Sequence, residues 1–250
     1  MTYCVGIRLN AGLVFLSDSR TNAGVDQIST CRKMMVYEKA GERFMVLMSA
    51  GNLSISQSVR EILQVERLER HGAEPLTIWN AHSMFDVARV LGSAVRRVYQ
   101  QDGPALKAAG LDFNASFILG GQIKGEAMRL FQVYSPGNFI EATREACFFQ
   151  IGESKYGKPI LDRVARPSMS LPDAAKLLLL SFDSTLRSNL SVGMPLDILL
   201  YRTGTLRVSL ERRIDRDDAY FQELSRSWSA SLREAFARIS GLDPGDPVSG

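Results

Sequence analysis

The pattern of hydrophobic and polar positions predicts runs of short strands that alternate with runs of helices. The first fifty residues contain four segments rich in β-forming residues, with turns at Gly12 and Gly41 inside the two pairs. These predicted strands are residues 3–9, 13–17, 33–37 and 43–48. A polar stretch, 20–30, separates the first pair from the second.

Amphipathic helices are predicted after these strands. Apolar residues at helical spacing indicate a helix from Asn52 or Ser54 to about Arg70, which stops at His71-Gly72, and a second helix over 80–100. The chain then returns to strands at 114–120, 128–134, 139–142 and 147–151. Helices 154–164 and 170–189, a hairpin of strands 197–201 and 205–210, and a last helix over 215–239 complete the pattern.

This order of elements argues against alternating βαβ units and a parallel sheet. It predicts an α+β fold with two antiparallel sheets stacked between helical layers. No linker interrupts the pattern, so we expect a single domain over 1–240, with the sandwich ending near 210 and a C-terminal helical extension over about 215–239. The last ten residues, 241–250, are rich in Gly, Pro and Asp and are expected to be a flexible tail.

Composition narrows the chemistry mainly through histidine. The net charge of +3 favours neither nucleic acid nor an acidic partner. The chain has only two histidines, His71 and His82, which argues against histidine-rich metal sites and leaves few options for a Ser-His-Asp triad. Neither a metal nor an organic cofactor is expected.

Cysteine usage and hydropathy indicate a cytoplasmic protein. The three cysteines, Cys4, Cys31 and Cys147, cannot all pair and show no C-x-x-C spacing, which suggests a reducing compartment. No apolar run reaches the roughly 18 residues that a membrane span requires. The first residues lack the basic segment of a signal peptide.

The first candidate for chemistry is Thr2, which follows the initiator methionine. Methionine aminopeptidases remove Met1 when the next side chain is small, and the mature chain would then begin with threonine. Such a residue combines a hydroxyl nucleophile with its own α-amine as the base. An α-amine with a pKa of roughly 7.7–8.0 suits that role at neutral pH.

Three further residues strengthen this hypothesis. Asp18 ends the second predicted strand, which returns beside Thr2, and Lys33 opens the third. A lysine near Thr2 would lower the pKa of its amine and hydroxyl, and Asp18 could be the partner that a buried lysine needs. Gly51 follows the fourth strand at a strand-to-helix turn, where its N–H could stabilise an oxyanion. Taken singly, each residue also fits an ordinary surface charge or turn.

Together these residues resemble proteasome β-subunits and the related bacterial HslV-type peptidases. The matching motifs include Thr2, Ser17-Asp18-Ser19-Arg20, Arg32-Lys33-Met34 and Ser49-Ala50-Gly51, in the family's order. The segments 117–121, 130–137, 150–154 and 187–193 also match, so the resemblance covers about 2–210. The chain length and the segments 151–159 and 189–197 look most like the bacterial branch called Anbu, the ancestral β-subunit.

The resemblance implies an N-terminal nucleophile hydrolase with a four-layer αββα sandwich. Thr2 would be the nucleophile, Lys33 would tune its pKa, Asp18 would orient Lys33, and the Gly51 N–H would form the oxyanion hole. A supporting serine of the family falls at Glu153 or Ser154, and we assign it to Ser154. Ser191 matches a second family serine, while Ser188 stands where the family usually has aspartate, which puts the strength of catalysis in doubt.

Substrate contacts are also implied by the resemblance. Arg20 and Thr21 would contact the substrate beside the nucleophile. The family's specificity pocket would be lined by Cys31, Met35, Ser49 and Leu53. These side chains are small to medium and uncharged, which suggests an uncharged substrate side chain.

Three functions remain open at this stage. The leading one is a self-assembling threonine hydrolase that cleaves peptide or other amide bonds in a homo-oligomeric ring or spiral. The second is an amidase with one specialised substrate, and the third is a structural ring subunit without catalysis. Retention of Met1 would block the amine and favour the third. An aromatic stripe on the last helix, around Trp228, is expected to be covered by the body or by a neighbouring subunit.

Overall fold

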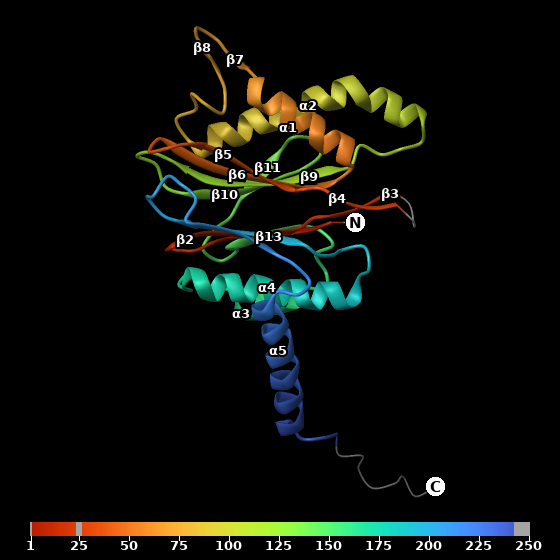
Figure 1. The fold of residues 1–250 in the computed structure, drawn as a ribbon. Helices are drawn as coiled ribbons and strands as arrows, with labels where there is room; N and C mark the ends of the chain where they lie inside the picture. The colour runs from red at the N-terminus through yellow and green to blue at the C-terminus, as the bar shows by residue number, and fades with distance from the viewer. Residues whose placement is uncertain (1, 24–26, 243–250) are drawn as a thin grey trace, which may run out of the picture. The chain divides into compact units, whose positions relative to one another are not determined.

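The structure, a computed structural model, describes residues 2–23 and 27–242. The chain forms two compact units, residues 1–216 and 217–250, which are described separately. The first unit has four layers, in which two five-stranded antiparallel sheets lie face to face and helices cover both outer faces (Figure 1). The predicted α+β sandwich of αββα type is confirmed.

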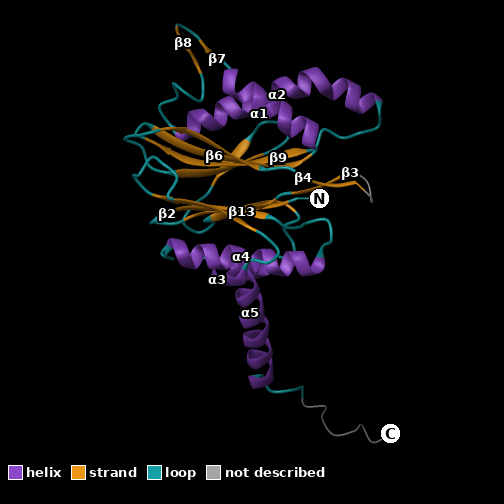
Figure 2. Ribbon diagram, viewed as in Figure 1, coloured by secondary structure: helices purple, strands orange, loops and turns teal. Residues whose placement is uncertain are grey.

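The first sheet contains the N-terminal hairpin at its centre. Its strands, in spatial order, are β12 (Phe148–Gly152), β1 (Tyr3–Arg8), β2 (Gly12–Asp18), β13 (Leu196–Arg202) and β14 (Leu210–Ile214). All neighbours are antiparallel. Helices α3 (Lys158–Val164) and α4 (Leu171–Ser188) lie on its outer side, and α4 packs against β1, β2 and β13 (Figure 2).

The second sheet is also antiparallel and carries the other helical pair. Its strands, in spatial order, are β11 (Phe139–Glu141), β10 (Arg129–Val133), β9 (Ala115–Ile123), β6 (Arg43–Gly51) and β5 (Met34–Lys39). Helices α1 (Leu53–Val65) and α2 (Met84–Ala108) cover its outer face.

Two hydrophobic clusters hold these layers together. Between the sheets, side chains from both inner faces interlock, and Phe44 stacks on Tyr201 with ring centroids 4.3 Å apart. Beneath α1 and α2, a second cluster joins the two helices to the outer face of their sheet. Because almost every residue of β1, β2 and β6 is buried, these strands are held by packing on both faces.

Two small hairpins were not predicted. The polar stretch 20–30 contains β3 (Arg20–Ala23), which pairs with β4 (Gln27–Thr30). The residues after α1 form β7 (Leu68–Arg70) and β8 (Ala73–Leu76), so the prediction of a helix to Arg70 was wrong. Glu66 leaves the helix because its buried carboxylate accepts hydrogen bonds from Ser93 Oγ and Arg97 Nη1 on α2.

Several predicted boundaries also moved. Helix α2 begins at Met84, after the Ser83 N-cap, and helix α3 begins at Lys158 rather than at 154. The final strand of the sandwich is β14 rather than 205–210. The loop before β14 is longer than predicted because the Tyr201 side chain binds the N–H of Leu206, and Gln122 binds the N–H of Gly204.

The second unit contains α5 (Ala219–Arg238), within the predicted last helix. Asp218 caps its N-terminus by accepting a hydrogen bond from the Phe221 N–H at 2.9 Å. Several large apolar side chains of this unit are exposed, among them Leu232 and Phe236. Most of the predicted flexible tail, 243–250, lies outside the described residues.

Candidate active site

Residue Thr2 is held in place through its backbone at the start of β1. Its carbonyl oxygen accepts a hydrogen bond of 2.7 Å from the Glu153 N–H. Gly152, with φ of +80°, packs so closely that a Cβ atom there would lie 1.9 Å from the Thr2 carbonyl oxygen. Only glycine fits this approach, so the turn after β12 fixes the position of Thr2.

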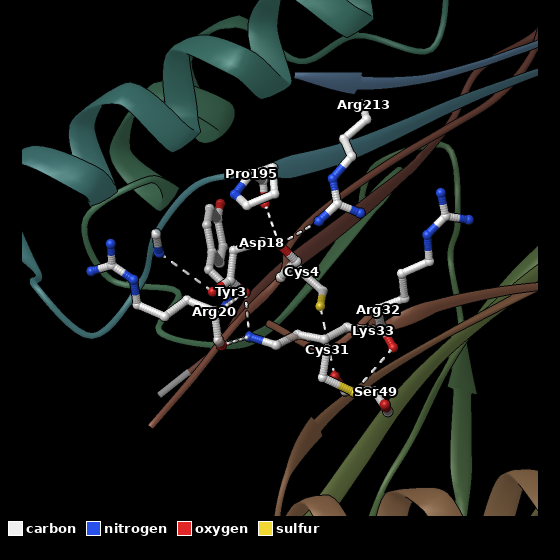
Figure 3. Close-up of polar contacts among 12 residues, drawn as sticks. Tyr3, Cys4, Asp18, Arg20, Cys31, Arg32, Lys33, Ser49, Pro195 and Arg213 are labelled. Atoms are coloured by element: carbon white, nitrogen blue, oxygen red, sulfur yellow. Dashed lines mark hydrogen bonds and ion pairs between the residues drawn. The ribbon is translucent and has the colours of Figure 1, made fainter. Parts of the chain in front are cut away.

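Asp18 and Lys33 form a buried ion pair beside this end of β1. Lys33 Nζ lies 2.7 Å from Asp18 Oδ1, and the two side chains are 5% and 0% exposed. The same Oδ1 accepts the Tyr3 N–H at 3.0 Å, and Lys33 also donates to the Arg20 carbonyl at 2.7 Å (Figure 3). The β1–β2 hairpin causes this arrangement, because its register sets Ser17 opposite Cys4 and so brings Asp18 beside Tyr3. The lysine charge is thereby held next to the peptide group that joins Thr2 to Tyr3.

Burial dominates the electrostatics of this site. It raises the pKa of the Asp18 carboxyl, and the Lys33 ammonium acts in the opposite direction, as do the N–H groups of Tyr3 and Gly193. Burial also raises the pKa of the Cys4 thiol. Cys4 is therefore a neutral thiol, and its Sγ contacts the Ser49 carbonyl at 3.8 Å.

The end of β6 approaches Thr2 from the other sheet. A Cβ atom on Gly152 would lie 3.5 Å from Ala50 Cβ, which places the residue before Gly51 against the turn that holds Thr2. Gly51 has φ of +107°, and a Cβ there would lie 2.4 Å from the Asn114 carbonyl oxygen, so this position also requires glycine. Asn52 then caps α1 by accepting the Ser54 N–H at 3.0 Å.

The residues of the expected specificity pocket come from four segments. Ser49 on β6 donates its N–H to the Lys33 carbonyl at 3.2 Å, and Met35 follows on β5. Leu53 opens α1 and is 38% exposed. The Cys31 N–H donates to the Ser19 carbonyl at 2.7 Å, which ties the segment before Lys33 to the end of β2.

Arg60 is a neighbour of this region that sequence reasoning missed. Its guanidinium donates from Nη1 to the Arg32 carbonyl at 3.3 Å, from the third turn of α1. Cys31 Sγ lies 3.7 Å from the same carbonyl oxygen. The only sequence signal for this contact was the helical spacing between Leu53 and Arg60.

Arg20 and Thr21 occupy the hairpin β3–β4. Arg20 donates from Nη1 to the Leu190 carbonyl at 2.7 Å, and its guanidinium packs against Gly193. Thr21 pairs with Ser29 across the hairpin. Arg20 thus supports the loop after α4 as well as accepting the Lys33 hydrogen bond through its carbonyl.

The three supporting serines have different surroundings. The Ser154 carbonyl accepts a hydrogen bond from Gln150 Nε2 at 3.2 Å, within the turn that follows β12. The Ser191 N–H donates to Asn189 Oδ1 at 2.8 Å. Ser188 is exposed as the last residue of α4, so a polar group there faces solvent.

Glu153 and Asn189 are two further buried polar residues, one in the turn after β12 and one at the end of α4. They are 8% and 9% exposed, and Asn189 Nδ2 donates to Glu153 Oε2 at 2.9 Å. The family resemblance placed the supporting residue at Glu153 or Ser154, but no sequence feature predicted that the Glu153 side chain would be buried. Asn189 carried no sequence signal beyond its place in the matching segment 187–193.

Within the described residues, no group of three or more His, Cys, Asp or Glu side chains could hold a metal ion. Nor does the described part of the chain contain a helix with the length and apolarity needed to cross a bilayer.

Comparison with solved structures decides the family. The chain is 52% identical to Anbu from a Hyphomicrobium species, with a TM-score of 0.87 over 96% of this chain and 99% of that one. It is 47% identical to Anbu, the ancestral beta-subunit, from Yersinia bercovieri, with a TM-score of 0.87 and coverage of 97% and 100%. The chain belongs to the Anbu family.

A third Anbu structure agrees with this assignment. It is the helical assembly of the Anbu complex from Pseudomonas aeruginosa, 45% identical, with a TM-score of 0.88 and coverage of 98% of this chain and 100% of that one. Neither a comparison with protein-family models nor one with curated proteins found a match. The Anbu matches span the whole sandwich and confirm the proteasome-like β-subunit fold that the sequence motifs indicated.

Proposed function

We propose that this Anbu-family chain is an N-terminal threonine hydrolase that cleaves peptide or other amide bonds. The observation that carries the proposal is the buried Lys33–Asp18 pair, whose carboxylate binds the N–H of the residue after Thr2. A buried charge pair is costly to maintain in a purely structural role. The pair lies beside Thr2, which exposes both a hydroxyl and an α-amine once Met1 is removed. This position suits a role of the pair in catalysis.

The mechanism begins once Met1 is removed. The α-amine of Thr2 takes the proton from its own hydroxyl, and the oxygen attacks the amide carbon of the substrate. The Lys33 ammonium lowers the pKa of both groups, and the Gly51 N–H stabilises the oxyanion. The leaving amine takes the proton, and water then releases the acyl group from Thr2.

The supporting roles follow the same plan. Asp18 orients Lys33, and the supporting residues are Ser154 in the turn after β12, Ser188 at the end of α4 and Ser191 in the loop that follows. Arg20 and Thr21 flank the substrate, and Cys31, Met35, Ser49 and Leu53 line its specificity pocket. Apart from the water that releases the acyl group, the proposed steps use groups of the protein itself.

We also propose that the chain self-associates and acts in the cytoplasm. The helical assembly of the Pseudomonas aeruginosa relative supports a homo-oligomer. In such an assembly, active sites that face an enclosed space would exclude folded substrates.

Mass spectrometry of the intact protein from its native host tests the first step, since the proposal requires loss of Met1. Activity is then measured on a panel of peptide and small-amide substrates. Thr2→Ala should abolish turnover and Thr2→Ser should retain part of it, while both keep the wild-type oligomer mass. Retained Met1, or full activity of the alanine variant, would refute the mechanism and favour a structural subunit.

A further inference from the structure

The residue whose backbone binds Thr2 carries a buried carboxylate that the proposed mechanism does not use. The Glu153 N–H binds the Thr2 carbonyl at 2.7 Å, so the two backbones are in direct contact. The Glu153 side chain is 8% exposed, and Asn189 Nδ2 donates to its Oε2 at 2.9 Å. The segment that holds Thr2 therefore also carries a buried acidic side chain.

Asn189 holds this carboxylate in a fixed geometry. Its backbone N–H donates to the Thr185 carbonyl at 2.9 Å, and its Oδ1 accepts the Ser191 N–H at 2.8 Å. One amide side chain thus joins Glu153 to the end of α4 and to Ser191. The turn after β12, which binds Thr2, is thereby linked to the loop after α4.

The charge of Glu153 is poorly compensated among the described residues. A carboxylate can accept about four hydrogen bonds, and in the described part of the chain the one donor to Glu153 at hydrogen-bond distance is the neutral amide of Asn189. Lys155 Nζ is 3.7 Å from Oε1, but the lysine side chain is 74% exposed and well screened by solvent. A buried carboxylate with a single neutral hydrogen-bond donor is stabilised by a further cation or donor nearby.

We infer that the Glu153 carboxylate is the anionic partner of the Thr2 α-amine and positions it for catalysis. This inference rests on the proposed function, because removal of Met1 creates the amine. Ser188 stands where the family resemblance implied an aspartate, so position 188 supplies no carboxylate in this chain. The exposed Ser188 carries no charge and lies at the surface end of α4.

The inference predicts that removal of the Glu153 charge and removal of the Lys155 charge shift the α-amine pKa in opposite directions. The charged groups around it are Glu153 and Asp18, which raise the α-amine pKa, and Lys33, Arg20 and Lys155, which lower it. Glu153→Gln keeps the shape and removes one negative charge, so it lowers the α-amine pKa by about one unit. Lys155→Gln raises that pKa by a smaller amount, because the lysine is exposed.

The measurement is competitive acetylation of the Met1-processed protein with trace acetic anhydride from pH 5 to 10. Mass spectrometry of the N-terminal peptide gives the fraction of Thr2 α-amine labelled at each pH, and the midpoint is its pKa. Glu153→Asp, which keeps the charge, should stay closer to wild type than Glu153→Gln. Asp162→Asn is the matched control, since this exposed carboxylate on α3 pairs with Lys158, and its loss should leave the midpoint unchanged.

The outcomes separate this inference from the proposed function. A free Thr2 amine with the same pKa in wild type and Glu153→Gln would overturn the inference and leave the hydrolase proposal standing. A wild-type protein that keeps Met1 would overturn both. If Glu153→Gln fails to fold, Glu153→Ala, which removes the same charge with a smaller side chain, is measured in its place, and an unchanged α-amine pKa in that variant contradicts the inference.

Discussion

At the level of single residues, the site depends on a small number of buried charged side chains. Asp18 is fully enclosed, and its two oxygens accept from Lys33, Tyr3 and Gly193. The Lys33 ammonium has two partners, the carboxylate and the Arg20 carbonyl. Loss of either side of the pair leaves an uncompensated group in the interior, and this cost is larger than the net stabilisation from the pair itself.

Removal of one partner of this pair should be strongly destabilising. We expect Asp18→Asn to lower the free energy of unfolding by about 3 kcal/mol, because the Lys33 charge remains buried. The double variant Asp18→Asn/Lys33→Met should lose less than the two single variants combined. Urea denaturation measures both values.

The control for this experiment is the exposed pair Lys158–Asp162, with N···O of 2.7 Å and side chains about half exposed. Asp162→Asn should cost less than about 1 kcal/mol. Equal losses at the two sites would contradict the view that burial makes the Asp18–Lys33 pair costly to break.

The three cysteines should differ in reactivity. Burial raises the pKa of Cys4 and of Cys147, so both remain thiols at pH 8, whereas Cys31 is partly exposed. Iodoacetamide at pH 8 should therefore modify Cys31 first, as followed by peptide mass spectrometry. In urea all three should react at similar rates, and fast labelling of Cys4 in the folded protein would show that β1 opens.

At the scale of elements, strand ends and glycine turns build the site. Residue 2 is reached by the turn after β12, and the end of β6 comes from the other sheet. Gly152 and Gly51 both have positive φ and both face backbone atoms at distances that exclude a side chain. β12 ends at Gly152 and β6 ends at Gly51, and at both positions these contacts leave room only for glycine.

Gly152→Ala tests this close packing, and Gly41→Ala is its matched control. Both glycines have left-handed φ, of +80° and +72°, but at Gly41 an added Cβ atom would have nothing within 4 Å. Gly41→Ala should cost only about 1–2 kcal/mol from the backbone conformation. Gly152→Ala adds a clash with the Thr2 carbonyl and should lower thermal stability further and abolish hydrolysis. Similar melting temperatures would contradict the packing around Thr2.

At the scale of the whole molecule, one site draws on both sheets of the sandwich. β1 and β2 supply Thr2 and Asp18, while the segments around β5 and β6 supply Lys33 and Gly51. The hydrophobic cluster between the sheets therefore determines the distance between Thr2 and Gly51. The C-terminal unit adds a helix whose apolar side chains include Leu232 at 50% exposed and Phe236 at 79% exposed.

Exposed apolar side chains of this size favour burial against another surface. We expect Leu232→Ser/Phe236→Ser to reduce the mass of the assembly, measured by light scattering after size-exclusion chromatography. Glu234→Gln on the same helix should leave the mass unchanged. An unaltered mass in the double variant would show that α5 plays no part in self-association.

The layered α+β fold, the family motifs and the candidates Thr2, Asp18, Lys33 and Gly51 could all be predicted from the order of the residues. Strand periodicity and the tight first hairpin are local features of the sequence. They are sufficient to predict that Asp18 returns beside Tyr3. Only the tertiary structure decided which polar groups are buried. Glu66 leaves α1 for partners on α2, Glu153 is enclosed by Asn189, and Ser188 faces solvent. Burial and partnership across distant segments depend on packing, and no local pattern of residues encodes them.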